Sequence, residues 1–369
     1  MASSSETPLP FSAPRNLPSR QAQPVPQLVD AVFEGGGMRA LAHIGALAVV
    51  EEHGYRWHRL AGTSAGAMIA ALVAAGYSAA ELHAIMTAID YRRFADGVSD
   101  GHLHLHQVSR LLFRLGLHSG DYLEHFIREL LLARGLRCFG DLRLPPQAAA
   151  PSDAQTTGLA DYRLTVIAAD ISRQRLLRLP QDLLSERATY GLDPDQLDIA
   201  RAVRMSASIP FFYVPVTLQR ADGRLSYIVD GGLVSDFPLF ALLPLGHQAP
   251  RPILGFRLCQ DEKGNGGEGH CEPGEEADGQ DDARWQAPAP LPPGNLIAFS
   301  QALLATMLSA HDRLALQLRS RAAGSIETIC IPVGNIEATR FDLSRGEIEA
   351  LYRRGRAAAD HFFATRADG

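Results

Sequence analysis

The chain has 369 residues, of which 46% are hydrophobic, and its formal net charge is −6. This length and apolar content are enough for one large α/β core, or for such a core with a small cap. No apolar window of about 18 residues occurs, so a transmembrane helix is not expected. No basic patch interleaved with aromatic residues occurs either, which argues against binding of nucleic acid.

The first residues, 1–27, form a lead that is rich in serine, proline and glutamine. Such a composition buries too little apolar surface to fold, so we expect a disordered segment. The lead has neither the basic nor the apolar region of a signal peptide. Because the four cysteines show no paired spacing, free thiols in a reducing compartment are favoured. The sequence therefore predicts a cytoplasmic protein, with peripheral membrane contact as a further option.

A glycine-rich run follows the first expected strand, residues 28–33. The run has the sequence Gly-Gly-Gly-Met-Arg at residues 35–39, and a helix over about 39–52 comes next. Without side chains, the N–H groups of Gly36 and Gly37 can approach a developing negative charge closely. The positive end of the following helix adds to this effect. The run therefore predicts an oxyanion hole.

Two other interpretations of this run remain open. Gly35-x-Gly37-x-x-Ala40 fits the dinucleotide-binding fingerprint, but the acidic residue expected about 20 positions later is missing from residues 55–61. The glycines can also serve helix–sheet packing alone. Arg39, in the first turn of the helix, either lends positive charge to the site or holds the loop through polar contacts.

A second turn, Gly-Thr-Ser-Ala-Gly at residues 62–66, has the pattern of a nucleophile elbow. The flanking glycines allow a sharp turn from a strand into a helix, which exposes the oxygen of Ser64. Residues 65–75 are almost entirely apolar, as a buried helix requires. The two glycine-rich turns together indicate acyl transfer with Ser64 as the nucleophile, although a structural turn serine is the plainer alternative.

An aspartate after a later strand is the candidate base. Residues 225–229 alternate and end in β-branched side chains, so they predict a strand that finishes at Asp230. Gly231 and Gly232 would let another segment approach the carboxylate closely. An ordinary Asp-Gly turn is the alternative.

These motifs, in this order, resemble the patatin-like phospholipase family. Residues 206–210 (Ser-Ala-Ser-Ile-Pro) and 230–238, which begin with Asp-Gly-Gly, resemble two further segments of that family. The resemblance covers roughly residues 28–260. Three positions depart from the family pattern, and none is a presumed catalytic residue: Ala40 and Met205 replace the usual glycine and alanine, and Asp236 replaces the usual asparagine.

The resemblance implies a lipid acyl hydrolase with a Ser–Asp dyad and no catalytic histidine. Its substrates would be fatty-acyl esters of phospholipids or related acylglycerols, reached through transient contact with a membrane surface. It implies neither a metal nor a cofactor. The residues that carry these roles here are Ser64 and Asp230 for the dyad, and Gly35, Gly36, Gly37 and Arg39 for the oxyanion hole.

Two rival functions are kept. One is an α/β-hydrolase with the order Ser…Asp…His, for which His247 in a loop is the best candidate histidine. The other is a lipid-binding or regulatory scaffold that keeps the fold without turnover. The remaining downstream histidines are His270, His311 and His361.

Residues 91–140 are expected to select the substrate. Apolar helical stretches there predict a lid, a membrane-docking face or ordinary core helices. His102, His104 and His106 alternate and would share one face of a strand, where they can bind a metal, but loop histidines are favoured.

Strand-like runs alternate with helical stretches along the chain, which predicts a three-layer α/β/α sandwich with a largely parallel central sheet. The expected strands are 28–33, 164–169, 213–218, 226–229, 253–258 and 326–331. We expect a catalytic domain over 28–260, an acidic disordered insert at 261–294, and C-terminal helices and a strand at 295–369 that complete the same domain. Residues 261–284 hold nine acidic and two basic residues. The sequence leaves the oligomeric state open.

Overall fold

The structure is a computed structural model of the chain. It describes residues 27–95, 114–145, 162–243, 251–259 and 326–367. The expected disordered lead up to residue 26, the acidic insert, the histidines at 102–106 and residues 295–325 of the expected C-terminal helices therefore lie outside the described residues. Among the described helices, none combines the length and the apolar character that crossing a bilayer requires.

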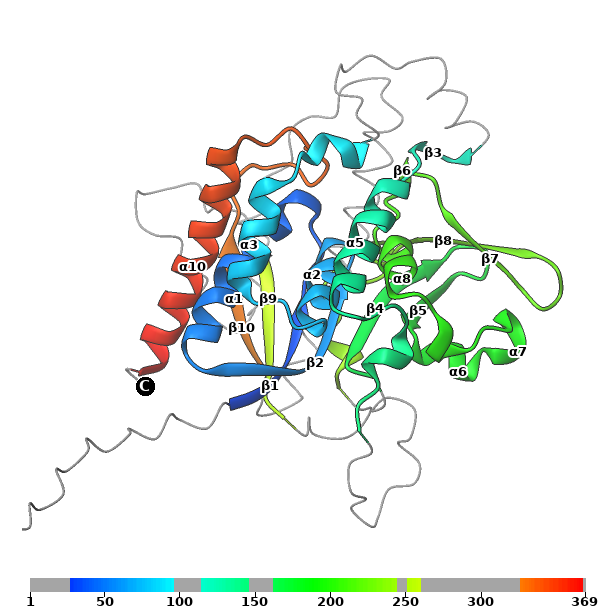
Figure 1. Ribbon diagram of the computed structural model, residues 1–369, viewed down its shortest axis with the longest axis horizontal. Coiled ribbons are helices and arrows are strands. Elements are labelled where there is room, and N and C mark those ends of the chain that lie inside the picture. The colour runs from blue at the N-terminus through cyan, green and yellow to red at the C-terminus, as the bar shows by residue number, and fades with distance from the viewer. Residues whose placement is uncertain (1–26, 96–113, 146–161, 244–250, 260–325, 368–369) are drawn as a thin grey trace, which may run out of the picture.

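In the part of the chain that the structure describes, eight strands build one mixed sheet. They are β1 Gln27–Phe33, β2 Tyr55–Thr63, β4 Leu164–Asp170, β5 Arg175–Leu179, β7 Val216–Gln219, β8 Leu225–Asp230, β9 Ile253–Cys259 and β10 Ile326–Pro332. Seven of them follow the order β10-β9-β1-β2-β4-β8-β7, and β5 pairs with β4 (Figure 1). Four of the seven pairings are parallel. The predicted largely parallel sheet is confirmed, and β10 continues it beyond the acidic insert.

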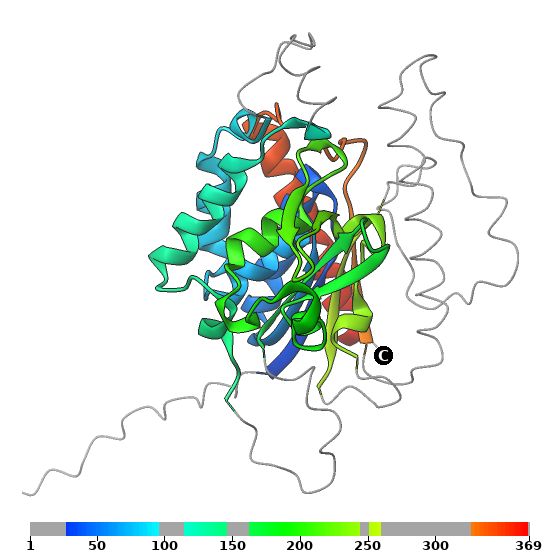
Figure 2. The same ribbon diagram turned by 90° about the vertical axis from the view of Figure 1, so that its right-hand side faces the viewer.

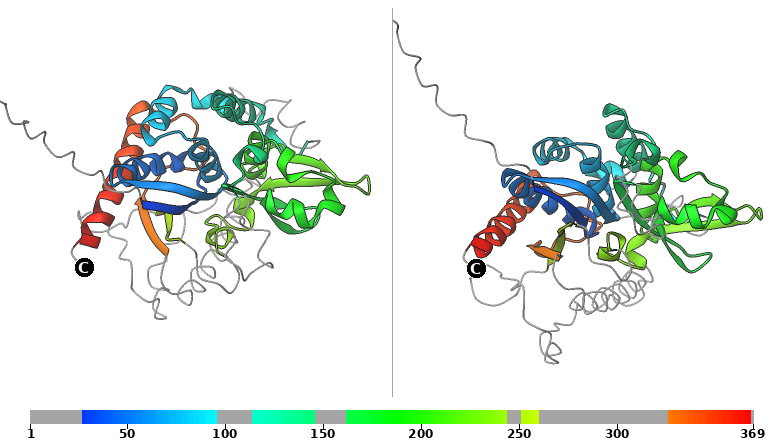
Figure 3. Two further views of the ribbon diagram at one scale, coloured as in Figure 1. Left: turned by 60° about the horizontal axis from the view of Figure 1, so that its bottom comes forward. Right: turned by 90° about the horizontal axis from the view of Figure 1, so that it is seen from below.

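The two faces of the sheet are buried by different segments. The α-helices of the described residues are α1 Ala42–Glu52, α2 Ala65–Ala74, α3 Ala79–Ala88, α5 Asp121–Ala133, α6 Gln181–Ser185, α7 Arg187–Tyr190, α8 Ile199–Ser206 and α10 Arg345–Ala367. Figures 2 and 3 show α1, α2, α3 and α10 gathered over one face. On the other face, Phe237, Leu239 and Leu242 pack against Val32 and Ile167. Successive residues of a strand point to opposite faces of the sheet. Because both faces are covered, the side chains on both sides of each central strand are apolar.

Local sequence explains where several elements begin and end. Ser78 and Glu81 form a capping box that starts α3. On α5, the buried Leu123, Ile127 and Leu131 recur every four residues, so one stripe of the helix faces the core.

Some predicted boundaries change in the structure. The expected strand 213–218 is two strands: β6 Phe211–Tyr213 pairs with β3 Gly116–His118 in a small separate sheet, whereas β7 joins the main one. Pro215 lies between them and has no N–H to donate, so the ladder cannot run through it. The expected helix from residue 39 begins as a 3-10 turn at Gly37–Leu41 before α1. Strands β3 and β5 were not predicted.

Helices α1 and α10 pack with their backbones unusually close together. A Cβ atom on Gly45 would lie 1.9 Å from the Tyr352 carbonyl oxygen, and one on Gly355 would lie 1.9 Å from the Ala42 carbonyl oxygen. Both contacts involve backbone atoms, which cannot move aside as a flexible side chain can. Glycine is therefore required at both positions for α10 to cover α1.

We expect Gly355→Ala to lower the free energy of unfolding by about 1–3 kcal/mol, because the added methyl group forces the two helices apart. The control is Gly346→Ala near the start of α10, where the nearest atom to an added Cβ is the Ser344 Oγ at 4.0 Å. That change should be neutral or stabilise the helix slightly. Urea unfolding monitored by circular dichroism measures both variants. Equal unfolding midpoints would contradict the role given to this contact.

Candidate active site

The candidate nucleophile and base meet on one edge of β4. Thr63, the last residue of β2, pairs with Ile167, and Asp230, the last residue of β8, pairs with the next residue, Ala168. Strand β2 runs parallel to β4 and β8 runs antiparallel to it, so their C-terminal ends point toward each other. This register brings Ser64 and Asp230 together, although they are 166 positions apart in the sequence.

Ser64 lies at a tight strand-to-helix turn, as the motif predicts. Its backbone has φ 54° and ψ −124°, a conformation that non-glycine residues rarely adopt. The flanking glycines are needed for close approach. A Cβ on Gly62 would lie 2.5 Å from the Gly66 carbonyl oxygen, and one on Gly66 would lie 2.4 Å from the Phe33 carbonyl oxygen. The turn is thus held tightly against the end of β1.

The side chains of Ser64 and Asp230 are in direct contact. The Ser64 Oγ donates a hydrogen bond of 2.7 Å to the Asp230 Oδ2, and the Gly232 N–H donates one of 2.7 Å to Oδ1. Each of the two residues is 6% exposed. Gly231 permits the tight turn, since a Cβ there would lie 2.1 Å from the Ile167 carbonyl oxygen.

The pKa of the Asp230 carboxyl is raised to about 7. Burial is the largest cause, because it disfavours the charged form. The hydrogen bonds from Ser64 and Gly232 lower the pKa, the negative charge of Asp236 raises it, and the positive charge of Arg204 lowers it. A carboxyl whose pKa lies near neutrality is suited to accept and return a proton.

Histidine does not contact this pair within the described part of the chain. The buried His43 bonds through Nε2 to the Glu34 carbonyl oxygen, and His361 is exposed on α10. His247, His270 and His311 lie outside the described residues. The Asp230 carboxylate, which a triad would use to orient a histidine, instead bonds directly to Ser64.

The glycine-rich run is held from both sides. The Gly35 N–H donates to the Asp236 carbonyl oxygen at 3.0 Å, and the Met38 N–H donates to the Ala338 carbonyl oxygen at 2.9 Å. Between them, the N–H groups of Gly36 and Gly37 have no acceptor among the described residues. Gly37 has φ 56°, and a Cβ there would lie 2.0 Å from the Ala338 carbonyl oxygen. The N–H groups of Gly36 and Gly37 are therefore available to donate hydrogen bonds, whereas the N–H of Gly35 is already bonded to the Asp236 carbonyl oxygen.

Arg39 holds this loop. Its Nε donates to the Gly36 carbonyl oxygen at 3.2 Å. Of the two roles that the sequence left open, this contact favours fixing the loop.

An apolar pocket opens beside Ser64. Its empty volume is about 590 Å³, measured out to its open mouth. The pocket is lined by Gly37, Met38, Ala40, Leu41, Ser64, Ala65, Met68, Ile69, Tyr91, Phe94, Leu123, Ala207, Ile209, Tyr213 and Phe341. The Tyr91 hydroxyl donates to the Met86 carbonyl oxygen at 2.7 Å and the Tyr213 hydroxyl to the Phe94 carbonyl oxygen at 2.9 Å. Because both hydroxyls are engaged by backbone, the tyrosines offer the pocket mainly their rings.

Sequence reasoning assigned a role to none of the aromatic residues that line the pocket, although Tyr91 and Phe94 lie within 91–140, the range expected to select the substrate. Tyr91 and Phe94 come from a 3-10 turn, Tyr91–Ala95, and Phe341 comes from the segment between β10 and α10. Ser206 and Ser208 lie in the quoted Ser-Ala-Ser-Ile-Pro segment but had no assigned role. No local signal marks the aromatic lining, because the fold alone brings these residues together.

Known proteins match this chain at the level of a family. Residues 31–243 match the family model described as patatin-like phospholipase. The uncharacterized protein YqhO of Bacillus subtilis (strain 168) is 35% identical over 335 residues, which cover 90% of this chain and 97% of that protein.

Two solved structures are similar to this one at low identity. VipD from Legionella pneumophila is 15% identical, with a TM-score of 0.43 over 92% of this chain and 67% of that chain. The type III effector ExoU, from Pseudomonas aeruginosa, is 17% identical, with a TM-score of 0.42 over 93% of this chain and 54% of that chain.

The raised pKa of Asp230 predicts a pH-dependent cost in stability. Its folded-state pKa of about 7 lies above the ordinary value of 3.8. Protonated Asp230 therefore stabilises the fold fully below pH 3.8, and this contribution is lost as the pH rises toward 7. Asp230→Asn removes the charge, so the stability of the variant relative to the wild type should increase as the pH rises between those two values.

Urea unfolding at several pH values measures this difference. Asp360→Asn, on the exposed side of α10, is the matched control and should track the wild type. A constant difference between Asp230→Asn and the wild type across this range would contradict a carboxyl that ionises near neutrality.

Proposed function

This chain belongs to the patatin-like phospholipase family, and we propose that it is a lipid acyl hydrolase acting through a Ser64–Asp230 dyad. Its substrates are fatty-acyl esters of phospholipids or related acylglycerols. The observation that carries the proposal is the 2.7 Å hydrogen bond from the Ser64 Oγ to the Asp230 Oδ2 beside an apolar pocket. The family supports hydrolysis of lipids in general, and this contact supports the specific dyad.

In the first half of the reaction, the Ser64 Oγ attacks the carbonyl carbon of the ester. Asp230 accepts the hydroxyl proton as the new C–O bond forms. The tetrahedral intermediate then collapses, the bond to the leaving alcohol breaks, and Asp230 returns the proton to that oxygen. The product is an acyl-enzyme on Ser64 and a free alcohol.

Gly36 and Gly37 are proposed as the oxyanion hole. Their N–H groups are the two in the glycine-rich run without an acceptor among the described residues, and Gly37 lines the pocket beside Ser64. One well-placed donor of this kind contributes roughly 10²–10³ in kcat. Gly35 and Arg39 support the loop through their contacts with Asp236 and Gly36.

In the second half, water attacks the acyl carbon and gives its proton to Asp230. The acyl bond to Ser64 then breaks, and Asp230 returns the proton to the Ser64 Oγ. A pKa of about 7 keeps Asp230 able to do both at neutral pH. This mechanism needs neither a metal nor a cofactor.

The apolar pocket is the proposed site of the acyl chain. The described residues that line it include no charged side chain, and its two tyrosine hydroxyls are already hydrogen-bonded to backbone. An unsubstituted fatty-acyl chain gains about 25 cal/mol for each Å² of its surface that such a lining removes from water. Because such chains reside in bilayers, we propose transient contact with a membrane surface during catalysis.

We expect Ser64→Ala and Asp230→Asn each to lower kcat/KM by about 10³-fold or more, because nucleophile and base act as a unit. For the same reason the double variant should be no slower than the slower single variant. Hydrolysis of a medium-chain p-nitrophenyl ester and of mixed phospholipid vesicles, both with EDTA present, measures these effects.

The control in the same assay is His247→Ala, which should keep wild-type activity. Loss of activity in this variant would favour the Ser-His-Asp hydrolase instead. A folded wild-type protein without turnover on either substrate would favour the lipid-binding scaffold.

The departure from the family pattern at Asp236 predicts a shifted pH profile. A Cβ on Gly232 would lie 3.3 Å from the Asp236 Oδ1 and 3.0 Å from the Asp230 Oδ1, so the two carboxylates share one small region. Asp236→Asn removes a negative charge and so lowers the pKa of Asp230. The acid limb of kcat/KM should therefore move to lower pH, with a relative gain at pH 6. An acid limb that stays in place or rises would contradict this electrostatic effect.

A further inference from the structure

The short segment Arg204–Ser208, at the end of α8, holds both residues of the proposed dyad. The Ser64 N–H donates to the Ser206 Oγ at 2.8 Å, and the Asp230 N–H donates to the Ser208 carbonyl oxygen at 2.9 Å. The Ser206 hydroxyl in turn donates to the Ile167 carbonyl oxygen on β4. The backbones of nucleophile and base are thus tied to the same five residues.

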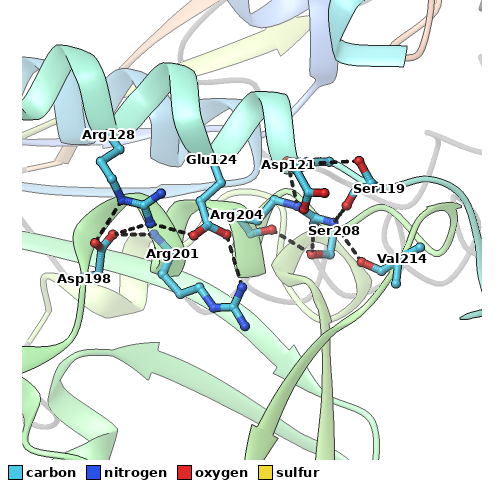
Figure 4. Close-up of polar contacts among 10 residues, drawn as sticks. Ser119, Asp121, Glu124, Arg128, Asp198, Arg201, Arg204, Ser208 and Val214 are labelled. Carbon is cyan, nitrogen blue, oxygen red and sulfur yellow. Dashed lines mark hydrogen bonds and ion pairs between the residues drawn. The ribbon is translucent and has the colours of Figure 1, made fainter. Parts of the chain in front are cut away.

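Arg204 anchors this segment from inside the protein. The residue is 3% exposed, and its guanidinium donates to backbone carbonyls around it (Figure 4). Nε bonds to the Gly120 oxygen at 3.1 Å, and Nη2 bonds to the Ser119 oxygen at 2.6 Å and the Val214 oxygen at 2.8 Å. Nη1 donates to the Ser208 hydroxyl. Four acceptors from three segments therefore converge on one side chain.

Those acceptors lie close in sequence to residues that line the apolar pocket. Gly120 precedes α5, which carries Leu123, and Val214 follows Tyr213; both Leu123 and Tyr213 line the pocket. A Cβ on Gly120 would lie 2.2 Å from the Arg204 Nε, so this glycine makes room for the guanidinium. Arg204 consequently links the dyad to the surface on which the acyl chain is proposed to lie.

The neighbouring arginines have a different role. Arg201 and Arg128 pair with the carboxylate of Glu124 (Figure 4). Arg128 also pairs with Asp198. These ion pairs join α5 to α8 at a partly exposed surface. Arg204 makes no ion pair within 4.0 Å among the described residues. The titratable groups that act on it from a distance are Tyr213, Glu124, Asp121 and Arg201, and its own charge acts on Asp230. The planar guanidinium of arginine presents several N–H donors in fixed directions, so it can bond to several carbonyl oxygens at once. The single ammonium group of a lysine cannot reach all of them together.

We propose that Arg204 is a positioning residue of this active site: it fixes the segment Arg204–Ser208 so that Ser64, Asp230 and the pocket wall keep one relative geometry. The proposal rests on the proposed function, because it concerns the efficiency of the same dyad. A displacement of about 1 Å between reacting groups costs on the order of 10²-fold in rate.

Arg204→Lys and Arg204→Gln test this role against Arg201→Gln, the control on the same helix. Titration of active sites with a fluorophosphonate gives the kcat of each folded, reactive molecule. We expect both Arg204 variants to lose about 10-fold or more in kcat per titrated site, with a smaller change in KM. Arg201→Gln should keep the wild-type kcat.

The pH profile separates positioning from charge. The positive charge of Arg204 lowers the pKa of Asp230. Arg204→Gln should therefore move the acid limb of kcat/KM to higher pH, whereas Arg204→Lys keeps the charge and should leave the limb near its wild-type place. A purely structural arginine would lower the melting temperature and the number of titratable sites but change neither kcat per site nor the acid limb, and this result would overturn the proposal.

Ser208→Ala keeps the test decisive if the Arg204 variants do not fold. It removes one acceptor of Arg204 while leaving the carbonyl that holds Asp230, so it should lower kcat per site about 3-fold or more. Unchanged kcat in a folded Ser208→Ala protein would count against the proposal. A wild-type protein that neither turns over esters nor reacts with the fluorophosphonate would instead overturn the proposed function, and the positioning role of Arg204 with it.

Discussion

The site depends on one feature of the sheet, the meeting of two strand ends on one edge of β4. Strand β2 arrives parallel and stops opposite Ile167, and β8 arrives antiparallel and stops opposite Ala168. A shift by one residue in either register would turn side chains to the other face and separate Ser64 from Asp230. The relative position of Ser64 and Asp230, on which the proposed chemistry depends, is therefore set by the hydrogen-bonding register of these strands.

Two unfavourable local features accompany this meeting. Ser64 adopts a strained backbone conformation, and Asp230 is a carboxylate that is almost fully removed from water. Each persists because surrounding contacts fix it: Gly62 and Gly66 admit the tight turn, and hydrogen bonds from Ser64 and Gly232 partly offset the burial of the charge. Strain and desolvation at one point of a fold are typical of functional sites, where they are part of the mechanism.

Residues beyond the matched family segment complete the site. The family model covers residues 31–243, yet the Ala338 carbonyl accepts the Met38 N–H beside the glycine-rich run, and Phe341 lines the pocket. Both belong to the segment between β10 and α10, which the close packing of α10 on α1 holds in place. The C-terminal region therefore takes part in the site as well as completing the sheet.

The sequence by itself determined the local parts: the serine turn, the glycine-rich run and a strand that ends at Asp230. These depend on backbone preferences and side-chain periodicity within a few residues, so they can be recognised without a fold. Only the tertiary structure decided that Ser64 contacts Asp230, that the pKa of Asp230 lies near 7, and that the segment Arg204–Ser208 holds both. Register, burial and the aromatic pocket arise from contacts between residues far apart in the chain, which no local pattern encodes.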